Sequence, residues 1–576
     1  MTVECPPRPR SERVEELGFV RQAMVSWLDP RQLVQTASRV IFSAIFAAYS
    51  DKREIQAALE TEDVIDRSHE GEFWIDFVAD LGDGFDSTYT IAWLLAQSEL
   101  SVRYGDTTAT TKRGRLLVMG GDQVYPTASL REYQNRTLGP YSAALPCVPD
   151  GPPPELLAVP GNHDWYDGLT NFIRIFCQKH WIGGWHTLQK RSYFAIKLPH
   201  RWWLWGIDIQ FDNSYIDDPQ LAYFQNVAQR HVAAGDRIIL CTAKPSWVYA
   251  ATEGPESYRN LDYFVRKIIE PSKAQLQVSI SGDSHHYCRF EEEGGTRQLI
   301  TAGGGAAFLS PTHHLPKTLG PELSLHPDSP KRTYQRRSEF PSAAKSRRLL
   351  LGALAIPIQN PSLWPVLGLV PLLLVWTLQL GPKGFVAGMQ SAGPLEMAAS
   401  FVQSPTSWLA AILVCLALGE FAKFPGWRRW LVGLAHASVQ ISVMLVVAWL
   451  TARVLTVISV HGIMFVFLLA VLVWSLGGLM AGLVLGLYLI ASSWGFGIHD
   501  NEAFSAMHIK DYKNFLRMRL GEDGTLTLFP IGIDRVCRRW RLDPHGDVSS
   551  PWFGAVDPID VRLLESPVLI GPISPP

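Results

Sequence analysis

The sequence predicts an α/β domain with mixed sheets, followed by an all-α transmembrane region and a small C-terminal domain that contains β-structure. Two observations predict this order. Within the first 345 residues, short motifs rich in Asp, Asn, His and Gly each follow an apolar, strand-like run. Residues 362–497 are nearly free of charge and rich in Leu, Val, Ala and Gly, and the chain after them is polar again.

A chain of 576 residues is long for a single domain and is expected to hold two or three. In the N-terminal part, apolar residues between Glu15 and Tyr49 recur at helical spacing, as in Val40–Ala48. That stripe suits packing on the main domain, which we favour, or on a membrane surface. The expected parts are an N-terminal helical segment at 1–69, the α/β domain at 70–345, the transmembrane region at 362–497 and a soluble C-terminal domain at 498–576.

Four motifs follow strand-like runs of the α/β domain. Because the carboxyl ends of the strands of an α/β sheet meet at one crevice, the motifs are expected to converge. Asp, Asn, His and Tyr supply oxygen and nitrogen ligands, which suit hard or borderline metal ions and not a thiolate site. The sequence therefore predicts a metal site. The runs are 73–79, 116–119, 156–159 and 277–280, and the motifs are Asp80–Asp83, Gly121–Tyr125, Gly161–Asp164 and Gly282–His286.

These motifs resemble those of the calcineurin-like metallophosphoesterases, whose pattern runs Asp-x-His, Gly-Asp, Gly-Asn-His-Asp/Glu, a His before Pro, and Gly-His-x-His. The match covers roughly residues 70–315. The resemblance implies an α/β/β/α sandwich with two metal ions, bridged by the carboxylate of Asp122. It also implies that Asn162 binds the second ion and that His163 serves the leaving group or the phosphate. His163 and its neighbour Asp164 are the expected catalytic residues.

Resemblance to one branch of that family implies a full set of ligands for the first metal position. The first motif has Gly82 where most members have His. The purple acid phosphatases also have Asp-x-Gly there, and they supply a Tyr three residues after the bridging Asp. The phenolate ligand implied in this way favours a ferric ion and would give a visible charge-transfer colour. The implied ligands are Asp80, Asp122, Tyr125 and His285.

The second metal position is poorer in ligands. The family's His before Pro corresponds to Ala243, and the first His of the last motif corresponds to Asp283. The ligands that remain are Asp122, Asn162 and Asp283, an all-oxygen set that suits Mg, Mn or Ca better than Zn. Lys244 is expected to join the catalytic residues, because its ammonium would replace a metal charge beside a phosphoryl group.

The implied reaction is metal-assisted hydrolysis of a phosphoester. Two ions, divalent or mixed-valence and drawn from Mn, Fe, Mg or Zn, would orient an in-line attack and lower the pKa of a bound water. The substrate class stays open between a lipid-linked pyrophosphate, a phosphoprotein and a soluble phosphoester. The alternative is a weakened phosphoesterase domain that senses a phosphorylated ligand, and Ala243 and Asp283 favour it. A gated transporter is disfavoured, because the spans hold almost no charged residues.

Two further features near these motifs leave alternatives open. Residues 301–307 contain three consecutive Gly after a strand-like run. They either line the site with backbone amides, as anion-binding loops do, or form a plain turn. His313 and His314 either complete the second metal position or face solvent.

Four apolar runs make up the expected transmembrane region. The last, Val454–Phe496, is about twice the roughly 20 residues that span a bilayer. It holds either one long or re-entrant element plus a span, or two spans that turn at Ser475–Gly478. Flanking Lys and Arg place the α/β and C-terminal domains in the cytoplasm and favour four spans over five, in a multi-pass protein. The other reading is a helical bundle buried in a soluble protein. The remaining runs are Trp364–Leu380, Trp408–Leu418 and Leu431–Leu450, and the flanking charges are Lys345–Arg348, Lys423–Arg429 and Lys510–Arg519.

The C-terminal segment contains a hairpin signal. Residues 514–520 and 525–533 are strand-like and flank Asp523–Gly524, a dipeptide typical of tight hairpin turns. The hairpin is expected to belong to a separate small domain, whose function the sequence does not indicate.

Composition limits the partners and the compartment. The net charge of −2 suggests no nucleic-acid partner. The expected partners are the phosphoester substrate that the resemblance implies, possibly lipid-linked, and the bilayer. The seven Cys are scattered without a Cys-x-x-Cys pair, which predicts a reduced chain without disulfides or structural zinc. The first residues, Met1–Pro6, lack the basic and apolar segments of a secretory signal.

Overall fold

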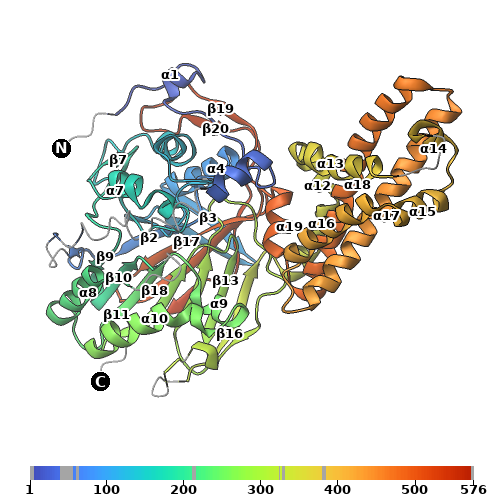
Figure 1. The fold of residues 1–576 in the computed structure, drawn as a ribbon. Helices are drawn as coiled ribbons and strands as arrows, with labels where there is room; N and C mark the ends of the chain where they lie inside the picture. The colour runs from blue at the N-terminus through green and yellow to red at the C-terminus, as the bar shows by residue number, and fades with distance from the viewer. Residues whose placement is uncertain are drawn as a thin grey trace. The chain divides into compact units, whose positions relative to one another are not determined.

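In the computed structural model the chain forms two compact units (Figure 1). The α/β unit consists of Met1–Val25, Thr36–Ser346 and Ile509–Pro576, and the helical unit consists of Ser26–Gln35 and Arg347–His508. The expected apolar stripe at Val40–Ala48 lies outside the described residues. Those residues are 5–38, 56, 58–59, 64–209, 216–323, 325–326, 331–378 and 384–571.

One sheet of the α/β unit has nine strands in the order β1-β9-β10-β11-β12-β14-β13-β16-β15. Its central strands, β10, β11, β12 and β14, run parallel, and β9 and β13 join them antiparallel. The strands are β1 Ile65–Asp66, β9 Phe194–Lys197, β10 Trp202–Ile207, β11 Arg237–Thr242, β12 Gln275–Ser281, β13 Tyr287–Glu292, β14 Gln298–Ala302, β15 Thr318–Leu319 and β16 Tyr334–Phe340.

The second sheet has the order β21-β18-β17-β2-β5-β6-β8-β7, with β22 beside β18. Strands β2, β5, β6 and β8 run parallel, and β17 lies antiparallel to β2. The four strand-like runs that precede the motifs are confirmed as β2, β5, β6 and β12. The strands are β2 Phe73–Val78, β5 Leu116–Met119, β6 Glu155–Ala158, β7 Trp181–Ile182, β8 Trp185–Thr187, β17 Lys513–Leu520, β18 Leu526–Ile533, β21 Val561–Leu563 and β22 Val568–Ile570.

The apolar residues of the two sheets form a shared core, and helices cover the outer faces. Successive side chains of a strand point to opposite faces. In β2, Ile75 and Phe77 therefore enter the core between the sheets, whereas Trp74 and Val78 enter the core under helices. Strands that are buried on both faces have unbroken apolar sequences, which is why these strands could be predicted from the sequence. The covering helices include α4 Phe85–Ala96, α6 Gly139–Ala144 and α7 Thr170–Phe176 on one side, and α8 Asp218–Arg230 and α10 Arg259–Phe264 on the other.

The expectation of a separate C-terminal domain at 498–576 is wrong. The predicted hairpin is present as β17 and β18, but β17 also pairs with β2 from Leu516↔Phe77 to Leu520↔Phe73. Figure 1 shows this red strand beside the blue one. A buried ion pair joins them: Arg517 Nε lies 2.6 Å from Asp76 Oδ1, and its Nη2 lies 3.0 Å from Oδ2. The helical unit is therefore inserted in the chain between β16 and β17.

The position of β17 also changes which Lys and Arg residues can be counted as charges that flank the transmembrane region. Lys513 and Arg517 are fully buried in the α/β unit, and Lys510 pairs with Asp86 at 2.9 Å. These three side chains are buried or ion-paired within the fold. They are therefore not the free loop charges from which membrane orientation is predicted. The cytoplasmic orientation of the α/β unit stays a prediction.

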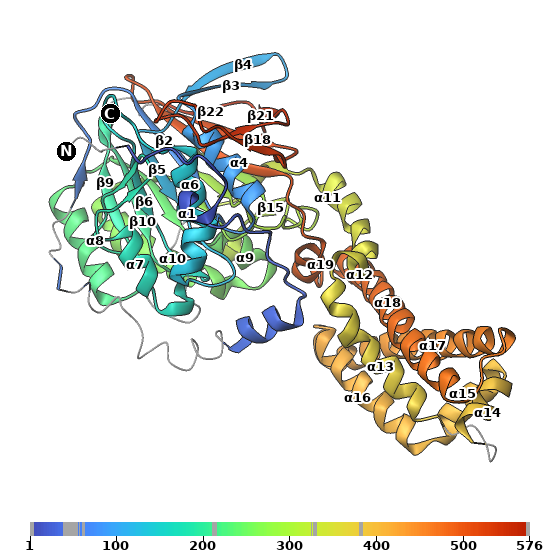
Figure 2. The ribbon, with the colours of Figure 1, turned by 90° about the horizontal axis from the view of Figure 1, so that it is seen from above.

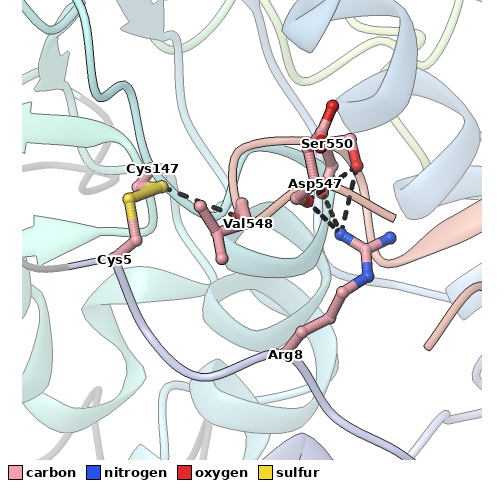
Figure 3. Close-up of a disulfide and its surroundings, with 6 residues drawn as sticks. All are labelled: Cys5, Arg8, Cys147, Asp547, Val548 and Ser550. Atoms are coloured by element: carbon pink, nitrogen blue, oxygen red, sulfur yellow. Dashed lines mark hydrogen bonds between the residues drawn. A yellow bond between two sulfur atoms is a disulfide. The ribbon is translucent and has the colours of Figure 1, made fainter. Parts of the chain in front are cut away.

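The expectation of a chain without disulfides is also wrong. Cys5 and Cys147 form a disulfide (Figure 3). The neighbouring Arg8 donates hydrogen bonds to the carbonyl oxygens of Asp547 (2.5 Å) and Ser550 (3.0 Å). The two Cys are 142 residues apart, so no local spacing announced the bond. Disulfides persist in oxidising compartments, which does not fit the reducing environment expected for this unit.

Among its described residues, the helical unit has two helices that are long and apolar enough to cross a membrane, α17 Arg428–Val457 and α18 Gly462–Phe496, with mean hydropathies of 2.0 and 2.5 (Figure 2). The number rises to four if each of two bent pairs is one span: Ala343–Gln359 with Pro361–Trp376 (57°), and Pro394–Gln403 with Pro405–Phe421 (86°). The helices are α12 Ile356–Gln359, α13 Trp364–Trp376, α14 Phe385–Ser391, α15 Pro394–Gln403, α16 Pro405–Phe421, α17 Arg428–Val457, α18 Gly462–Phe496 and α19 Asp500–Met507, and α11 Ala343–Leu349 leads into them.

The alternative of two spans that turn at Ser475–Gly478 is wrong, because α18 runs unbroken through these residues. Its Gly residues serve close packing instead: a Cβ on Gly477 would lie 2.6 Å from the ring of Pro371. The outer faces of the unit are apolar; Leu413 is 59% exposed and Phe467 is 61% exposed. Such faces suit lipid better than water, which argues against a bundle buried in a soluble protein.

Candidate metal centre

The four residues expected at the first metal position lie together at the carboxyl ends of β2, β5 and β12. The phenol oxygen of Tyr125 is their meeting point. It lies 3.1 Å from Asp80 Oδ1, 3.1 Å from Asp122 Oδ2 and 3.2 Å from His285 Nε2. All four side chains are buried. Two strands of one sheet and one strand of the other therefore supply a compact set of three oxygen donors and one nitrogen donor.

The backbone at three candidate ligands is left-handed. The φ angles are 59° at Asp80, 48° at Asp122 and 66° at Asp283. Asp tolerates this region better than most residues, yet such conformations cost of order 1–3 kcal/mol each and gather at functional sites. The turns are cross-linked, since Asp80 N–H donates to the carbonyl of Gly121 at 2.9 Å and Leu81 N–H donates to that of Asp122 at 2.9 Å. The fold thus holds these carboxylates in place before any ligand binds.

Two Gly residues allow neighbouring loops to approach the carboxylates. A Cβ on Gly161 would lie 2.1 Å from Asp122 Oδ1, and one on Gly303 would lie 2.5 Å from Asp80 Oδ2. Both distances are far shorter than a van der Waals contact, so only Gly fits at these positions.

The electrostatics of the centre favour a bound cation. Burial, together with the neighbouring carboxylates of Asp122 and Asp283, raises the pKa of Asp80 well above its usual range. Burial and the nearby Asp283 raise the pKa of Asp122 to about 8. Buried carboxylates are stable in ionised form when they are paired or coordinate a metal ion. The donor set therefore fits a metal ion.

His285 is oriented as a ligand. Its Nδ1 lies 2.8 Å from the carbonyl oxygen of Phe308, which places the ring proton on Nδ1 and the lone pair on Nε2. Nε2 lies 3.6 Å from Asp80 Oδ1. Burial lowers the pKa of His285 to about 3, so the ring is neutral, as metal binding requires. Metal-binding His residues commonly donate their other N–H to a carbonyl in this way.

The expected ligands of the second position make protein hydrogen bonds. The N–H of Asp283 donates to both carboxylate oxygens of Asp80, at 3.1 and 2.9 Å. The carboxylate of Asp283 accepts a short hydrogen bond from the hydroxyl of Tyr249, in α9 Ser246–Thr252. The side-chain amide of Asn162 donates to Tyr166 Oη at 3.4 Å. The second position is less prepared for an ion than the first.

Ala243 lies where the resemblance placed a missing His. It packs on the turn before Asp122: a Cβ on Gly121 would lie 2.9 Å from the Ala243 methyl group. A methyl group offers no donor atom, which weakens the second position. Lys244 follows directly and is half-buried. Its catalytic role stays a prediction.

His163 borders the first position. Its backbone N–H donates to Asp122 Oδ1 at 2.8 Å, and its ring lies 4.4 Å from that of Tyr125 and 4.9 Å from that of Tyr166, between centroids. The ring Nδ1 lies 3.0 Å from the carbonyl oxygen of Pro126, which places its proton there. Burial lowers the pKa of His163 to about 4.

Asp164 is engaged within the protein. Its Oδ1 accepts a hydrogen bond from the hydroxyl of Tyr133 at 2.5 Å, and its Oδ2 accepts from the backbone N–H of Gly161 (2.8 Å) and of Gln123 (3.3 Å). These bonds join the loops after β5 and β6. Asp164 thus cross-links two loops of the centre, and the catalytic role expected for it stays a prediction.

Two residues near the centre were missed by sequence reasoning. Tyr249 is one, because its position in α9 gave no signal of its contact with Asp283. Lys513 is the other: its Nζ donates to the carbonyl oxygen of Ala307 at 2.6 Å, and burial lowers the pKa of its ammonium to about 8. The sequence placed Lys513 among the loop charges of the C-terminal segment, and only the pairing of β17 with β2 brings it here.

The comparisons with known proteins give weak similarity. No protein-family model and no curated protein sequence matches the chain. Among solved structures, GAP50, titled the anchor in the inner membrane complex of Plasmodium, aligns at 13% identity and a TM-score of 0.31, over 42% of this chain and 74% of that one.

Two further solved structures align over about half of their own length. PhoD has 11% identity and a TM-score of 0.27, over 41% of this chain and 56% of that one. The purple acid phosphatase PPD1, isolated from yellow lupin (Lupinus luteus) seeds, has 12% identity and a TM-score of 0.28, over 47% of this chain and 48% of that one. These values describe a partial likeness only.

Proposed function

We propose that the α/β unit is a metal-dependent phosphohydrolase that the helical unit associates with a membrane. One observation carries the proposal: the buried convergence of Asp80, Asp122 and His285 on the hydroxyl of Tyr125. Buried carboxylates beside a neutral, oriented imidazole suit a metal site, because a bound cation would compensate the buried negative charges. The substrate is a phosphoester, either lipid-linked or soluble.

The residues divide between two metal positions. The first takes a phenol oxygen and an imidazole nitrogen, which suit an iron ion, and the second takes oxygen ligands only, which suit Mg or Mn. When bound, the ions supply Lewis-acid activation of water and of the phosphoryl group. The residues of the first position are Asp80, Asp122, Tyr125 and His285, and those of the second are Asp122, Asn162 and Asp283.

The remaining residues act on the substrate and on the loops. Because the Nδ1 proton of His163 is held by the carbonyl of Pro126, its Nε2 is the atom that would bind the phosphate or pass a proton to the leaving group. A phosphate anion nearby would raise the low pKa of this imidazole toward the range where it carries a proton. Lys244 would bind a phosphoryl oxygen with its ammonium. Asp164 would hold the loops that carry Asn162 and His163.

The test uses the full chain in detergent with a phosphomonoester and a phosphodiester of p-nitrophenol, and with added Mn, Mg, Fe or Zn. We expect metal-dependent hydrolysis that falls at least about 100-fold in Asp122→Asn, because that variant removes the ligand common to both positions. Asp106 is an exposed carboxylate in the turn between β3 Glu99–Tyr104 and β4 Thr107–Lys112. Asp106→Asn is the matched control and should keep full activity. If neither ester is hydrolysed with any of the four ions, the proposed hydrolase activity is wrong.

A second candidate is a sensor of a phosphorylated ligand. The methyl group of Ala243 and the engagement of Asp283 by Tyr249 favour it, because both weaken the second position. A sensor would bind inorganic phosphate in a metal-dependent way without hydrolysing either ester. Calorimetric titration of phosphate into the metal-loaded chain therefore separates the two functions.

A further inference from the structure

The loop 303–313, which follows β14, holds the ring and the backbone of His285. The carbonyl oxygen of Phe308 lies 2.8 Å from the ring Nδ1. The hydroxyl of Ser310 accepts a hydrogen bond from the N–H of His285 at 3.2 Å, and the N–H of Ser310 donates to the carbonyl of His285 at 3.4 Å. Both the position and the rotation of this imidazole therefore depend on the loop.

The same loop holds the turn that carries Asp80. The N–H groups of Ala306 and Ala307 donate to the carbonyl of Asp80 at 2.7 and 3.0 Å, and the N–H of Gly305 donates to that of Ala79 at 2.9 Å. These amides are used inside the protein, so the Gly-rich run is a structural turn here and does not offer them to an anion. Two candidate ligands from different sheets thus share one support.

On its other side, the loop is bonded to the two residues of the α/β unit that flank residues 347–508 of the helical unit. Ser346 is the last residue of the α/β unit before that unit, and its hydroxyl lies 3.0 Å from the N–H of Thr312 and 2.8 Å from Nδ1 of His313. Ile509 is the first residue after it, and its carbonyl accepts from the N–H of Leu309 at 3.3 Å.

The returning strand adds two more bonds to the loop. Lys513 donates from Nζ to the carbonyl of Ala307 at 2.6 Å, and the N–H of Asn514 donates to the carbonyl of Gly304 at 2.9 Å. Lys513, Thr312 and Ser346 are fully buried. Because leaving such a buried group without its partner is unfavourable, we expect a displacement of either connection to move the loop.

We infer that loop 303–313 is a positioning loop through which the helical unit regulates the candidate metal centre. Ser310 and Lys513 are positioning residues, which act on His285 and Asp80 through the loop, and Ser346 links the loop to the outgoing chain. The inference rests on the proposed metal-dependent function. Coupling of this kind is reciprocal: a metal ion that tightens the loop must also change the connections, and a change in the helical unit must alter the affinity for metal.

The test is hydrogen–deuterium exchange of the full chain in detergent, with and without Mn²⁺. We expect Mn²⁺ to slow exchange in 303–313, and also by at least about fivefold in 347–359 and 500–508, which belong to the helical unit. In Ser346→Ala, slowing in 303–308 should remain while slowing in 347–359 is lost. Ser342→Ala, an exposed residue just before α11, is the matched control and should behave as the wild type.

The possible results separate the inference from the function beneath it. Slowing confined to 303–313 in the wild-type chain would overturn the coupling and leave the metal centre intact. Equal behaviour of Ser346→Ala and Ser342→Ala would overturn the role of Ser346 as the link. No slowing with Mn²⁺, Mg²⁺, Zn²⁺ or iron would overturn the proposed metal centre, and the coupling with it.

Discussion

The two halves of the candidate centre differ in how far the protein has built them. At the first position, Asp80 and His285 are buried, lie within hydrogen-bonding distance of the Tyr125 hydroxyl and are held by loop 303–313. At the second, a methyl group replaces a ligand at Ala243, and Asp283 is held by a tyrosine. The difference teaches that the fold alone organises the first proposed position, whereas the side chains of the second would have to rearrange before it could bind an ion.

The largest expected effect tests whether the first half depends on the C-terminal strands. A chain that ends at residue 345 loses β17, so Asp76 keeps a buried charge without Arg517, and loop 303–313 loses Lys513. Breaking a buried pair alone costs about 3–5 kcal/mol, so we expect no cooperative thermal unfolding and no metal binding.

The control for this truncation keeps the C-terminal strands and replaces 347–508 with a short Gly/Ser linker. A short linker suffices because Ser346 and Ile509 are bonded to Thr312 and Leu309, which are three residues apart. We expect this chain to fold and to bind metal. A folded, metal-binding fragment 1–345 would contradict the dependence on β17.

The next effect compares one ligand from each half. Asp80→Asn should weaken metal affinity by more than the roughly 10–100-fold that loss of a ligand's hydrogen-bond partner costs. Asn162→Ala should leave the tightest-bound ion in place and weaken only a second one. Equilibrium dialysis with metal analysis measures both affinities and stoichiometry. Equal losses in the two variants would show that the halves do not differ.

The pH dependence of metal binding follows from the raised pKa of Asp122, about 8 without metal. Below that pH the carboxyl group holds a proton, which an ion must displace, so the affinity falls as the pH falls. Since at least one proton is displaced, the dissociation constant of Mn²⁺ should rise about tenfold or more per pH unit from 8 to 6. A constant affinity between pH 6 and 8 would contradict this electrostatic account.

A substitution can also repair the weaker half. Ala243→His would restore a nitrogen ligand at the second position, and we expect the affinity for a second ion to rise by about one order of magnitude. The bound metal per chain should then approach two. Ala250→His, in the buried part of α9 but outside the motifs, controls for a general effect of an added imidazole. If both variants bind equally, Ala243 is not at the metal position.

The smallest expected effect concerns Tyr249. Tyr249→Phe removes the hydroxyl that donates to Asp283 and leaves that carboxylate to a cation. One hydrogen bond to a charged group is worth about 1.5–3 kcal/mol, and part of it is lost anyway when the ion binds, so we expect the second-ion affinity to rise only several-fold. Tyr263→Phe, on an exposed side chain, should have no effect. A loss of affinity in Tyr249→Phe would make the tyrosine a support for the second position.

The parts of the fold that local pattern controls were predictable. The apolar runs before each motif became β2, β5, β6 and β12, because strands covered on both faces must be apolar throughout. The Asp523–Gly524 turn gave the hairpin of β17 and β18, since that dipeptide adopts the backbone that a tight turn needs. The convergence of Asp80, Asp122, Tyr125 and His285 was predictable as well, because these residues follow strands whose carboxyl ends meet. Their role as metal ligands stays a prediction.

The sequence by itself thus determined the strands, the motif residues and the apolar helices, all of which depend on neighbours a few positions away. Only the tertiary structure decided that β17 joins β2, that Cys5 meets Cys147, and that Lys513 is buried. A charged residue in a strand looks the same whether its partner is solvent or Asp76, 441 residues earlier in the chain. Such pairings depend on the packing of whole layers, which no local pattern encodes.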